Sequence, residues 1–239
     1  MKLITIDFET YYSRLFSLSK MTTEEYIRDP RFEVIGVAVQ VGDGEPEWFS
    51  GDAKDTHQFL KRFDWDNSLA LAHNAIFDGA ILSWKFGIRP KGWLDTLSMG
   101  RALHGTEVGG SLKAMAERYG LGEKGTEVLN ALGKRRKDFN DVELSRYGDY
   151  CINDVELTYD IFNQMVRSGF PRKEMQLIDL TLKMFVRPKL ILDKGLLTAH
   201  LTDIQQKKEA LLSEAGHAKE DLMSNLKFAE LLRSYGVIP

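Results

Sequence analysis

The first hydrophobic segment constrains the fold most, because it combines a strand pattern with two acids. Residues 2–8 have the composition of a buried strand, with Leu, Ile or Phe at most positions. Side chains alternate between the faces of a strand, so Asp7 and Glu9 emerge together and Phe8 points to the opposite side. The pattern predicts one face in a core and a carboxylate pair on the other. The alternative is a strand that ends in two solvated acids, because Asp-x-Glu is a short motif.

A third acid follows a second buried strand. The run Leu-Ala-Leu-Ala at residues 69–72 predicts that strand, and the apolar spacing of residues 77–84 predicts a helix after it. Asp78 lies in the first turn of this helix, where the helix dipole favours a carboxylate. Asn74 precedes it and could contact a substrate backbone. The alternatives are an ordinary first-turn acid and a loop or cap residue.

The fourth acid, Asp154, lies on a long predicted helix. Between residues 142 and 165, apolar side chains recur at helical spacing. Tyr150 and Asp154 are four positions apart, so they share a helix face one turn from each other. A phenol in that position could orient a water molecule beside an ion that Asp154 binds. The alternative is a core tyrosine and a surface acid.

Four carboxylates that come together repel one another unless cations join them. Oxygen ligands select hard divalent ions such as Mg²⁺ or Mn²⁺. Two such ions about 3.5–4 Å apart form the clamp that cleaves phosphodiesters. The net charge of −3 differs from the basic excess of proteins that bind duplex DNA tightly. It is compatible with an enzyme that holds a few nucleotides of a single strand through metal ions.

Charge runs and cysteine usage give weaker indications. Residues 134–137 form the one dense basic run, which could contact phosphates or could be a solvated face. A single cysteine, Cys151, excludes an internal disulfide framework, fits a reducing cytoplasm, and is expected to be a packed core thiol. No run approaches the ~18 apolar residues of a membrane helix, so we expect no membrane partner.

Three short motifs, in this order and spacing, resemble those of the DEDD superfamily of 3′–5′ exonucleases: Asp7-x-Glu9, Asn74-x3-Asp78 and Tyr150-x3-Asp154. The tyrosine identifies the tyrosine subclass, because the histidine of the other subclass would stand at Asp149. The resemblance covers about residues 1–165 and is strongest to the proofreading domain of family A DNA polymerases, particularly those of bacteriophages. A bacteriophage origin would place the protein in the host cytoplasm.

The resemblance implies a role for each residue of the motifs. Asp7, Glu9 and Asp154 would hold the ion that activates water. Asp7 would also reach a second ion, which Asp78 would support through water. Tyr150 and Glu9 would orient the attacking water.

The same resemblance implies which residues contact the substrate. Thr10 and Asn74 would contact the terminal nucleotides. Tyr12 follows the first motif and could stack on a base, since base stacking tolerates any sequence. The alternative for Tyr12 is a surface aromatic that packs on its own domain.

The order of the patterns predicts an α/β fold with a mixed sheet flanked by helices. Strands are expected at residues 2–8, 32–41, 46–50 and 69–72 and near Trp93, with a hairpin turn at residues 42–44. Helices are expected at residues 55–63, 77–84 and 111–119 and after Asp141. Residues 123–140 are polar and basic, and part of them is expected to be mobile. By resemblance this is the ribonuclease H-like fold.

A helical segment is expected to follow the sheet domain. Pro171 marks the change, so we expect an exonuclease domain at residues 1–170 and a second region at residues 171–239. In the second region helices are predicted at residues 174–186, 194–212 and 225–235, with a strand at most at residues 190–192. It resembles the start of the thumb or linker region of family A polymerases. We therefore expect an excised part of a longer polymerase chain.

The leading hypothesis is a metal-dependent 3′–5′ exonuclease that releases nucleoside monophosphates from single-stranded or frayed DNA ends. One alternative is an RNA-processing exoribonuclease of the same subclass, which the polymerase-like stretch at residues 111–160 disfavours. Another is an inactive nucleic-acid-binding module. The presence of all four acids and Tyr150 argues against it.

Overall fold

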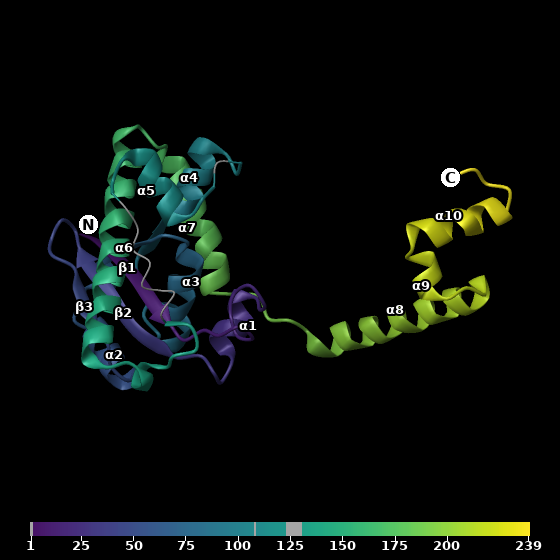
Figure 1. Cartoon of the computed structure of the whole chain (residues 1–239), viewed down its shortest axis with the longest axis horizontal. Helices are drawn as coiled ribbons and strands as arrows, with labels where there is room; N and C mark the ends of the chain where they lie inside the picture. Colours follow the sequence, from purple (N-terminus) through teal and green to yellow (C-terminus); the bar gives the residue numbers. More distant parts are fainter. Residues whose placement is uncertain (1, 108, 123–130) are drawn as a thin grey trace. The chain divides into compact units, whose positions relative to one another are not determined.

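The computed structural model describes residues 2–107, 109–122 and 131–239 of the chain (Figure 1). Residues 123–130, in the stretch that the sequence predicts to be partly mobile, lie outside the described residues. The chain divides into two compact units, Met1–Pro188 and Lys189–Pro239.

A five-stranded mixed sheet lies at the centre of the first unit, in the strand order β3-β2-β1-β4-β5. Its strands are β1 (Lys2–Thr10), β2 (Val34–Val41), β3 (Glu47–Phe49), β4 (Ser68–Ala72) and β5 (Gly92–Asp95). The first three strands pair antiparallel, and β4 and β5 continue the sheet parallel to β1. All five predicted strands of the sheet domain are therefore confirmed.

Helices cover the sheet and complete the predicted architecture. They are α1 (Thr23–Arg28), α2 (Ala53–Leu60), α3 (Ala75–Ala80), α4 (Thr96–His104), α5 (Leu112–Tyr119), α6 (Asp141–Arg167) and α7 (Arg172–Val186). The helix predicted at residues 77–84 is divided, because α3 passes into a π-helical turn at Ile81–Lys85. The sequence patterns miss α1 and α4. The first is a single capped run of six residues, and the second begins directly where β5 ends.

The two faces of β1 have different surroundings. Ile4, Ile6 and Phe8 lie in the largest hydrophobic core, and the ring of Phe8 stacks on Phe86 with 5.9 Å between centroids. The opposite face looks toward α6, which packs across β1, β2 and β3 (Figure 1). The strand therefore separates a hydrophobic core from the face that carries its acids.

A tryptophan fills the contact between α6 and the sheet. A Cβ atom on Gly36 of β2 would lie 2.1 Å from the Trp48 ring, and one on Gly148 of α6 would lie 2.5 Å from it. Both positions therefore require glycine, because any larger side chain would collide with the indole. The Trp48 ring sets the distance at which α6 packs on the sheet.

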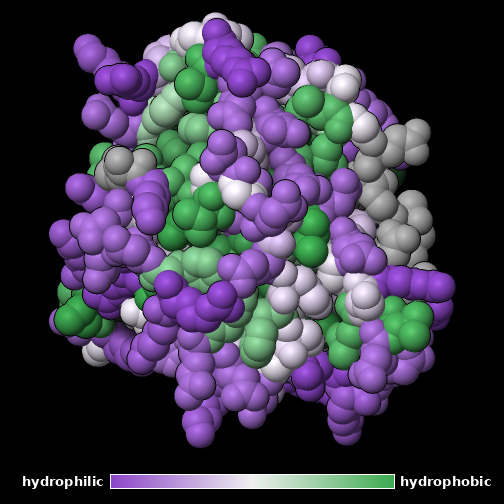
Figure 2. Space-filling view, turned by 90° about the vertical axis from the view of Figure 1, so that its left-hand side faces the viewer, coloured by the Kyte–Doolittle hydropathy of each residue, from purple (hydrophilic) through white to green (hydrophobic). Residues whose placement is uncertain are grey.

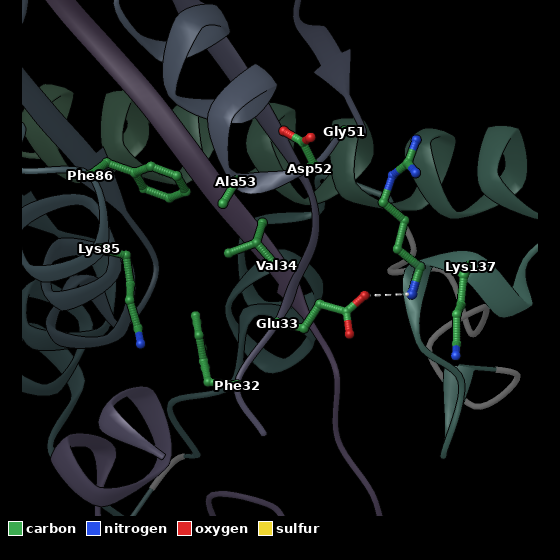
Figure 3. Close-up of a pocket in the computed structure, with 10 residues that line it drawn as sticks. Phe32, Glu33, Val34, Gly51, Asp52, Ala53, Lys85, Phe86 and Lys137 are labelled. Atoms are coloured by element: carbon green, nitrogen blue, oxygen red, sulfur yellow. Dashed lines mark hydrogen bonds between the residues drawn. The ribbon is translucent and has the colours of Figure 1, made fainter. Parts of the chain in front are cut away.

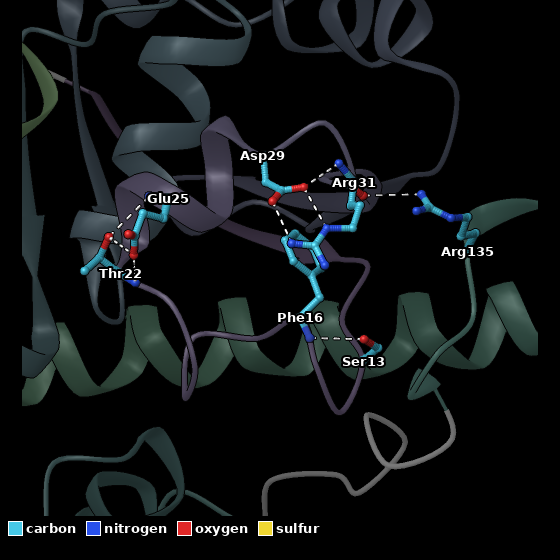
Figure 4. A network of polar contacts seen from close by, with 7 residues as sticks. All are labelled: Ser13, Phe16, Thr22, Glu25, Asp29, Arg31 and Arg135. Atoms are coloured by element: carbon cyan, nitrogen blue, oxygen red, sulfur yellow. Dashed lines mark hydrogen bonds and ion pairs between the residues drawn. The ribbon is translucent and has the colours of Figure 1, made fainter.

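Polar contacts fix the chain after β1 (Figure 4). Thr22 and Glu25 form a capping box at the start of α1. Asp29 accepts hydrogen bonds from Arg31 Nε at 2.8 Å and Nη2 at 2.7 Å. Arg135 donates to the Arg31 carbonyl at 3.3 Å. This network ties the segment that follows the first acidic motif to the segment that precedes α6.

Helix α7 belongs to the first unit. Leu182 and Val186 are buried in the main core, and the backbone N–H of Trp93 in β5 donates to Asp179 at 2.7 Å. Helix α7, which follows Pro171, is therefore part of the compact unit Met1–Pro188.

The second unit is helical. It contains α8 (Lys194–Ala215), α9 (Lys219–Leu222) and α10 (Asn225–Ser234), and none of these described helices has a buried residue. The strand considered at residues 190–192 is not present in this described segment. Its three side chains are exposed, and no neighbouring strand pairs with them.

The surface mixes residue types. On the side that Figure 2 shows, hydrophobic residues lie in patches that hydrophilic residues interrupt. Within the described part of the chain, no helix is both long enough and apolar enough to cross a membrane.

Candidate active site

The carboxylate pair of β1 lies on the face toward α6. Potential ligand atoms of Asp7, Glu9 and Cys151 all lie within 4.8 Å of one another. Asp7 is half-buried, and only 9% of the Glu9 surface is exposed. The two acids therefore form a close, partly desolvated pair, rather than two solvated charges at a strand end.

Asp78 joins this pair from the first turn of α3. Its Oδ1 accepts a hydrogen bond from the backbone N–H of Phe8 at 3.0 Å, and the residue is 2% exposed. Burial raises the pKa of the Asp78 carboxyl well above its usual value, and the neighbouring charge of Asp7 raises it further. Asp78 is thus a buried acid next to β1, not an ordinary first-turn acid on the surface.

One face of α6 supplies the rest of the site. Four residues at helical spacing point to β1: Tyr147, Tyr150, Cys151 and Asp154. Asp154 is 4% exposed, so it is not a surface acid. Tyr150 shares a hydrogen bond with Asp154. The pKa of Tyr150 is raised first by burial and then by the charges of Asp154 and Glu9. The structure therefore brings all four predicted acids and Tyr150 together.

Tyr147 is a residue of the site that the motifs do not reveal. Its hydroxyl donates a hydrogen bond to Glu9 Oε2 at 2.5 Å. Burial raises the pKa of Tyr147, and the charge of Glu9 raises it further. The signal in the sequence is its position three residues before Tyr150, on the same helix face.

Cys151 is the packed thiol that the sequence predicts, and it also contacts the site. It is fully buried, and its Sγ lies 3.2 Å from Asp7 Oδ2 and 3.4 Å from the Asp7 carbonyl oxygen. Burial raises the pKa of the thiol, and the charge of Asp7 adds to this effect. The thiol thus donates toward Asp7, as Tyr147 does toward Glu9.

The predicted substrate residues lie beside the acids. The Thr10 hydroxyl is 2.9 Å from that of Tyr26, which donates to the Tyr11 carbonyl at 2.5 Å. Because a tyrosine has one hydroxyl proton, Thr10 is the donor in the first contact. Tyr12 packs against Tyr147 and its neighbours, and its pKa is raised by burial and by Glu9.

Asn74 lies in a strained turn at the start of α3. Its φ of 69° is left-handed, and its backbone N–H donates to Asp95 Oδ1 at 2.8 Å. Asp95 also accepts from the Leu97 N–H at 3.1 Å and from the Ser98 hydroxyl at 2.6 Å. A carboxylate at the end of β5 therefore fixes the loop that holds Asn74.

The basic side chains of residues 134–137 mostly form contacts with other residues of the protein. Lys134 pairs with Glu143 at 2.6 Å, and Arg135 pairs with Glu33 at 2.5 Å. Lys137 lines a pocket with Lys85, and Glu33 lies between them (Figure 3). None of the four acids is among the described residues that line this pocket. Residues 134–137 therefore mainly connect the segment before α6 to other parts of the protein through ion pairs.

The carboxylates fit a divalent cation. Asp78 and Asp154 are buried, and the pKa of Asp78 is raised first by its burial and then by the charge of Asp7, so the acids also repel one another. A hard cation would neutralise this repulsion and accept their oxygen ligands. A sheet that carries such a group suits a metal-dependent phosphodiester hydrolase.

The sequence matches the family model of 3′–5′ exonucleases over residues 4–169. The chain belongs to this family, whose activity is that of a nuclease. No curated protein sequence matches the chain.

Solved structures of other proteins have the same fold. NrnC of Brucella melitensis has a TM-score of 0.55 and 15% identity, over 77% of this chain and 81% of that one, and has also been solved with bound Mg²⁺. RNase D of Trypanosoma brucei has a TM-score of 0.56 and 17% identity, over 81% and 68% of the two chains. The family B DNA polymerase of the hyperthermophilic archaeon Pyrobaculum calidifontis has a TM-score of 0.53 and 18% identity, over 77% and 27%. These likenesses confirm the predicted ribonuclease H-like fold.

Proposed function

We propose that this protein removes nucleoside monophosphates from the 3′ ends of single-stranded or frayed DNA, with two divalent cations. The observation that supports the proposal is the close pair of Asp7 and Glu9 on β1, with Asp78 of α3 hydrogen-bonded to the backbone of Phe8 between them. Asp154 of α6 acts on Tyr150, as do the charges of Asp7 and Glu9. Carboxylates from β1, α3 and α6 would together hold a phosphodiester between two ions.

Each residue has a distinct part in the proposed reaction. Asp7, Glu9 and Asp154 would hold one ion. Asp7 would also bind the second ion, which Asp78 would support through water. Bound Mg²⁺ or Mn²⁺ would supply water activation and charge neutralisation. Tyr150, which is bonded to Asp154, would orient the attacking water together with Glu9. Thr10, Tyr12 and Asn74 would contact the terminal nucleotides.

The choice of DNA rests on resemblance. Residues 111–160 resemble the proofreading domain of family A polymerases of bacteriophages, and a DNA polymerase is among the proteins of similar fold. We therefore propose a proofreading role in the host cytoplasm, with a polymerase domain in the same longer chain as its partner. The likeness to an RNase D supports the second candidate, an exoribonuclease.

The test compares digestion of matched DNA and RNA oligonucleotides that carry a 5′ label, with Mg²⁺, with Mn²⁺ and with EDTA. We expect stepwise shortening of DNA from the 3′ end with either ion, and none with EDTA. The Asp7→Ala variant, purified identically, controls for contaminating nucleases. Faster digestion of RNA would favour the exoribonuclease, and undiminished activity of Asp7→Ala would overturn the assignment.

The structure of the DNA end provides a second test. Removing a paired terminal nucleotide from its stack costs a few kcal/mol, of the order seen when bases are flipped. Mismatched 3′ ends should therefore be shortened faster than paired blunt ends. An internal phosphorothioate should stall digestion that arrives from the 3′ side. Cleavage of a closed single-stranded circle would exclude an exonuclease.

A further inference from the structure

The hydrogen bond between Tyr147 and Glu9 joins two side chains 138 positions apart in the sequence. Tyr147 is 2% exposed, so its hydroxyl is removed from bulk water and directed at one oxygen of the carboxylate. Hydrogen bonds to charged acceptors are roughly twice as strong as neutral ones. The contact therefore restrains Glu9 considerably.

The position of the hydroxyl is set by packing. The Tyr147 ring stacks on Phe139 with 5.6 Å between centroids and on Tyr150 with 6.2 Å. The centroid of the Trp48 ring lies 6.4 Å from that of Tyr147, and the indole packs against Gly148. These three neighbouring rings fix the position of the Tyr147 ring and hydroxyl. The Glu9 carboxylate must therefore orient itself toward the hydroxyl.

We propose that Tyr147 is a positioning residue that orients Glu9 for metal binding before any ion arrives. The proposal rests on the proposed function, because it concerns the same acids. Helix α6 supplies two tyrosines, and each one forms a hydrogen bond with a different acid. Tyr147 bonds to Glu9, and Tyr150 bonds to Asp154. The O–H dipole of Tyr147 also offsets part of the repulsion between Glu9 and its acidic neighbours.

The test replaces Tyr147 by Phe, which keeps the stacked ring and removes the hydroxyl. Binding of Mn²⁺ to the metal-free protein is measured by titration calorimetry, without substrate. We expect the affinity to fall roughly 10-fold or more, the range that loss of a hydrogen bond to a charged group gives. The half-maximal Mg²⁺ concentration for nuclease activity should rise in parallel. Tyr159→Phe, on the same helix and with no described link to the acids, should leave both unchanged.

A double-mutant comparison separates positioning from general packing. In the Glu9→Ala background, Tyr147→Phe should leave Mn²⁺ affinity unchanged, because its partner is already absent. An equal loss in both backgrounds would show a structural role only and overturn the proposal, as would wild-type affinity in Tyr147→Phe itself.

The two proposals can fail separately. A wild-type protein that binds Mn²⁺ but digests no nucleic acid would end the proposed function, and the calorimetric comparison would still decide the role of Tyr147. Should Tyr147→Phe not fold, Glu9→Asp withdraws the carboxylate from the same hydroxyl by one methylene. Unchanged Mn²⁺ affinity in that variant would overturn the positioning role.

Discussion

We expect Asp78 to destabilise the metal-free protein, because its carboxyl group is buried and lies beside the charge of Asp7. Its pKa in the folded protein is raised, so the folded state keeps a proton that the unfolded chain releases near pH 4, about the ordinary value. Stability from this group is present below that pH and is lost as the pH rises through the folded pKa. The metal-free protein should therefore become less stable as the pH rises.

The substitution Asp78→Asn tests this effect. Asparagine keeps an oxygen that can accept the Phe8 N–H but carries no charge. In EDTA, we expect this variant to be more stable than wild type at pH 7, with the difference shrinking toward pH 4, while nuclease activity is lost. Urea unfolding at several pH values provides the measurement. Equal stability at every pH would show that the buried charge has no such effect.

We expect the Tyr150 hydroxyl to contribute to the catalytic rate more than to the stability of the fold. Tyr150→Phe keeps the ring that stacks on Tyr147 and removes the hydroxyl. We expect kcat to fall, by at most about 10²–10⁴-fold, the range for a positioned proton-handling group. Asp154→Ala should lose more, because it removes an expected metal ligand. Full activity of Tyr150→Phe in single-turnover assays would reduce Tyr150 to a core residue.

The Cys151 thiol should be inert in the folded protein. It is fully buried, and burial with the charge of Asp7 raises its pKa, so it stays protonated at neutral pH. A thiol-reactive disulfide reagent should label no cysteine in the native state and one after unfolding in guanidinium. Rapid labelling of the native protein would mean that α6 separates readily from β1.

At the scale of elements, the contact between α6 and the sheet determines whether the site assembles. Alanine usually stabilises a helix relative to glycine, by roughly 0.5–1 kcal/mol. Gly148→Ala should do the reverse, because its Cβ would lie 2.5 Å from Trp48. We expect a loss of about 1–3 kcal/mol in the free energy of unfolding, as for overpacked cores. Activity should fall too, since α6 carries Tyr150 and Asp154.

Gly195→Ala provides the matched control for this substitution. Gly195 lies in α8, and the nearest atom to an added Cβ would be 3.4 Å away. Thermal unfolding followed by tryptophan fluorescence should detect the difference between the two variants. A Gly148→Ala protein as stable as wild type would mean that Trp48 can move aside without loss.

At the scale of the whole molecule, the compact units define where the chain can be divided. A fragment of residues 1–188 retains α7, with Leu182 and Val186 in the core. It should unfold cooperatively and keep the metal-dependent activity of the longer chain. A fragment of residues 1–170 lacks α7, uncovers part of that core, and should be strongly destabilised. Circular dichroism melts of both fragments give the measurement, and equal stability would show that α7 is dispensable.

Features that depend on the local geometry of a strand or a helix can be predicted from the sequence. Strand alternation places Asp7 and Glu9 on one face, and helical spacing places Tyr150 beside Asp154, because each period is set within a few residues. The same patterns predict all five strands of the sheet and the long helix α6. Helices α1 and α4 escape them, because α1 is a run of only six residues and α4 begins directly where β5 ends, with no break in the sequence pattern between them.

The sequence by itself determined the mixed sheet and the exonuclease family, and it indicated the four acids as candidate metal ligands. Only the tertiary structure decided how the acids are held, because those contacts join distant parts of the chain. Tyr147 reaches Glu9 and Cys151 reaches Asp7 only when α6 packs on β1. Likewise α7 joins the first unit through side chains of β5 and the core, although composition indicates a boundary before it. Local pattern cannot specify such contacts, since packing selects which of many compatible faces meet.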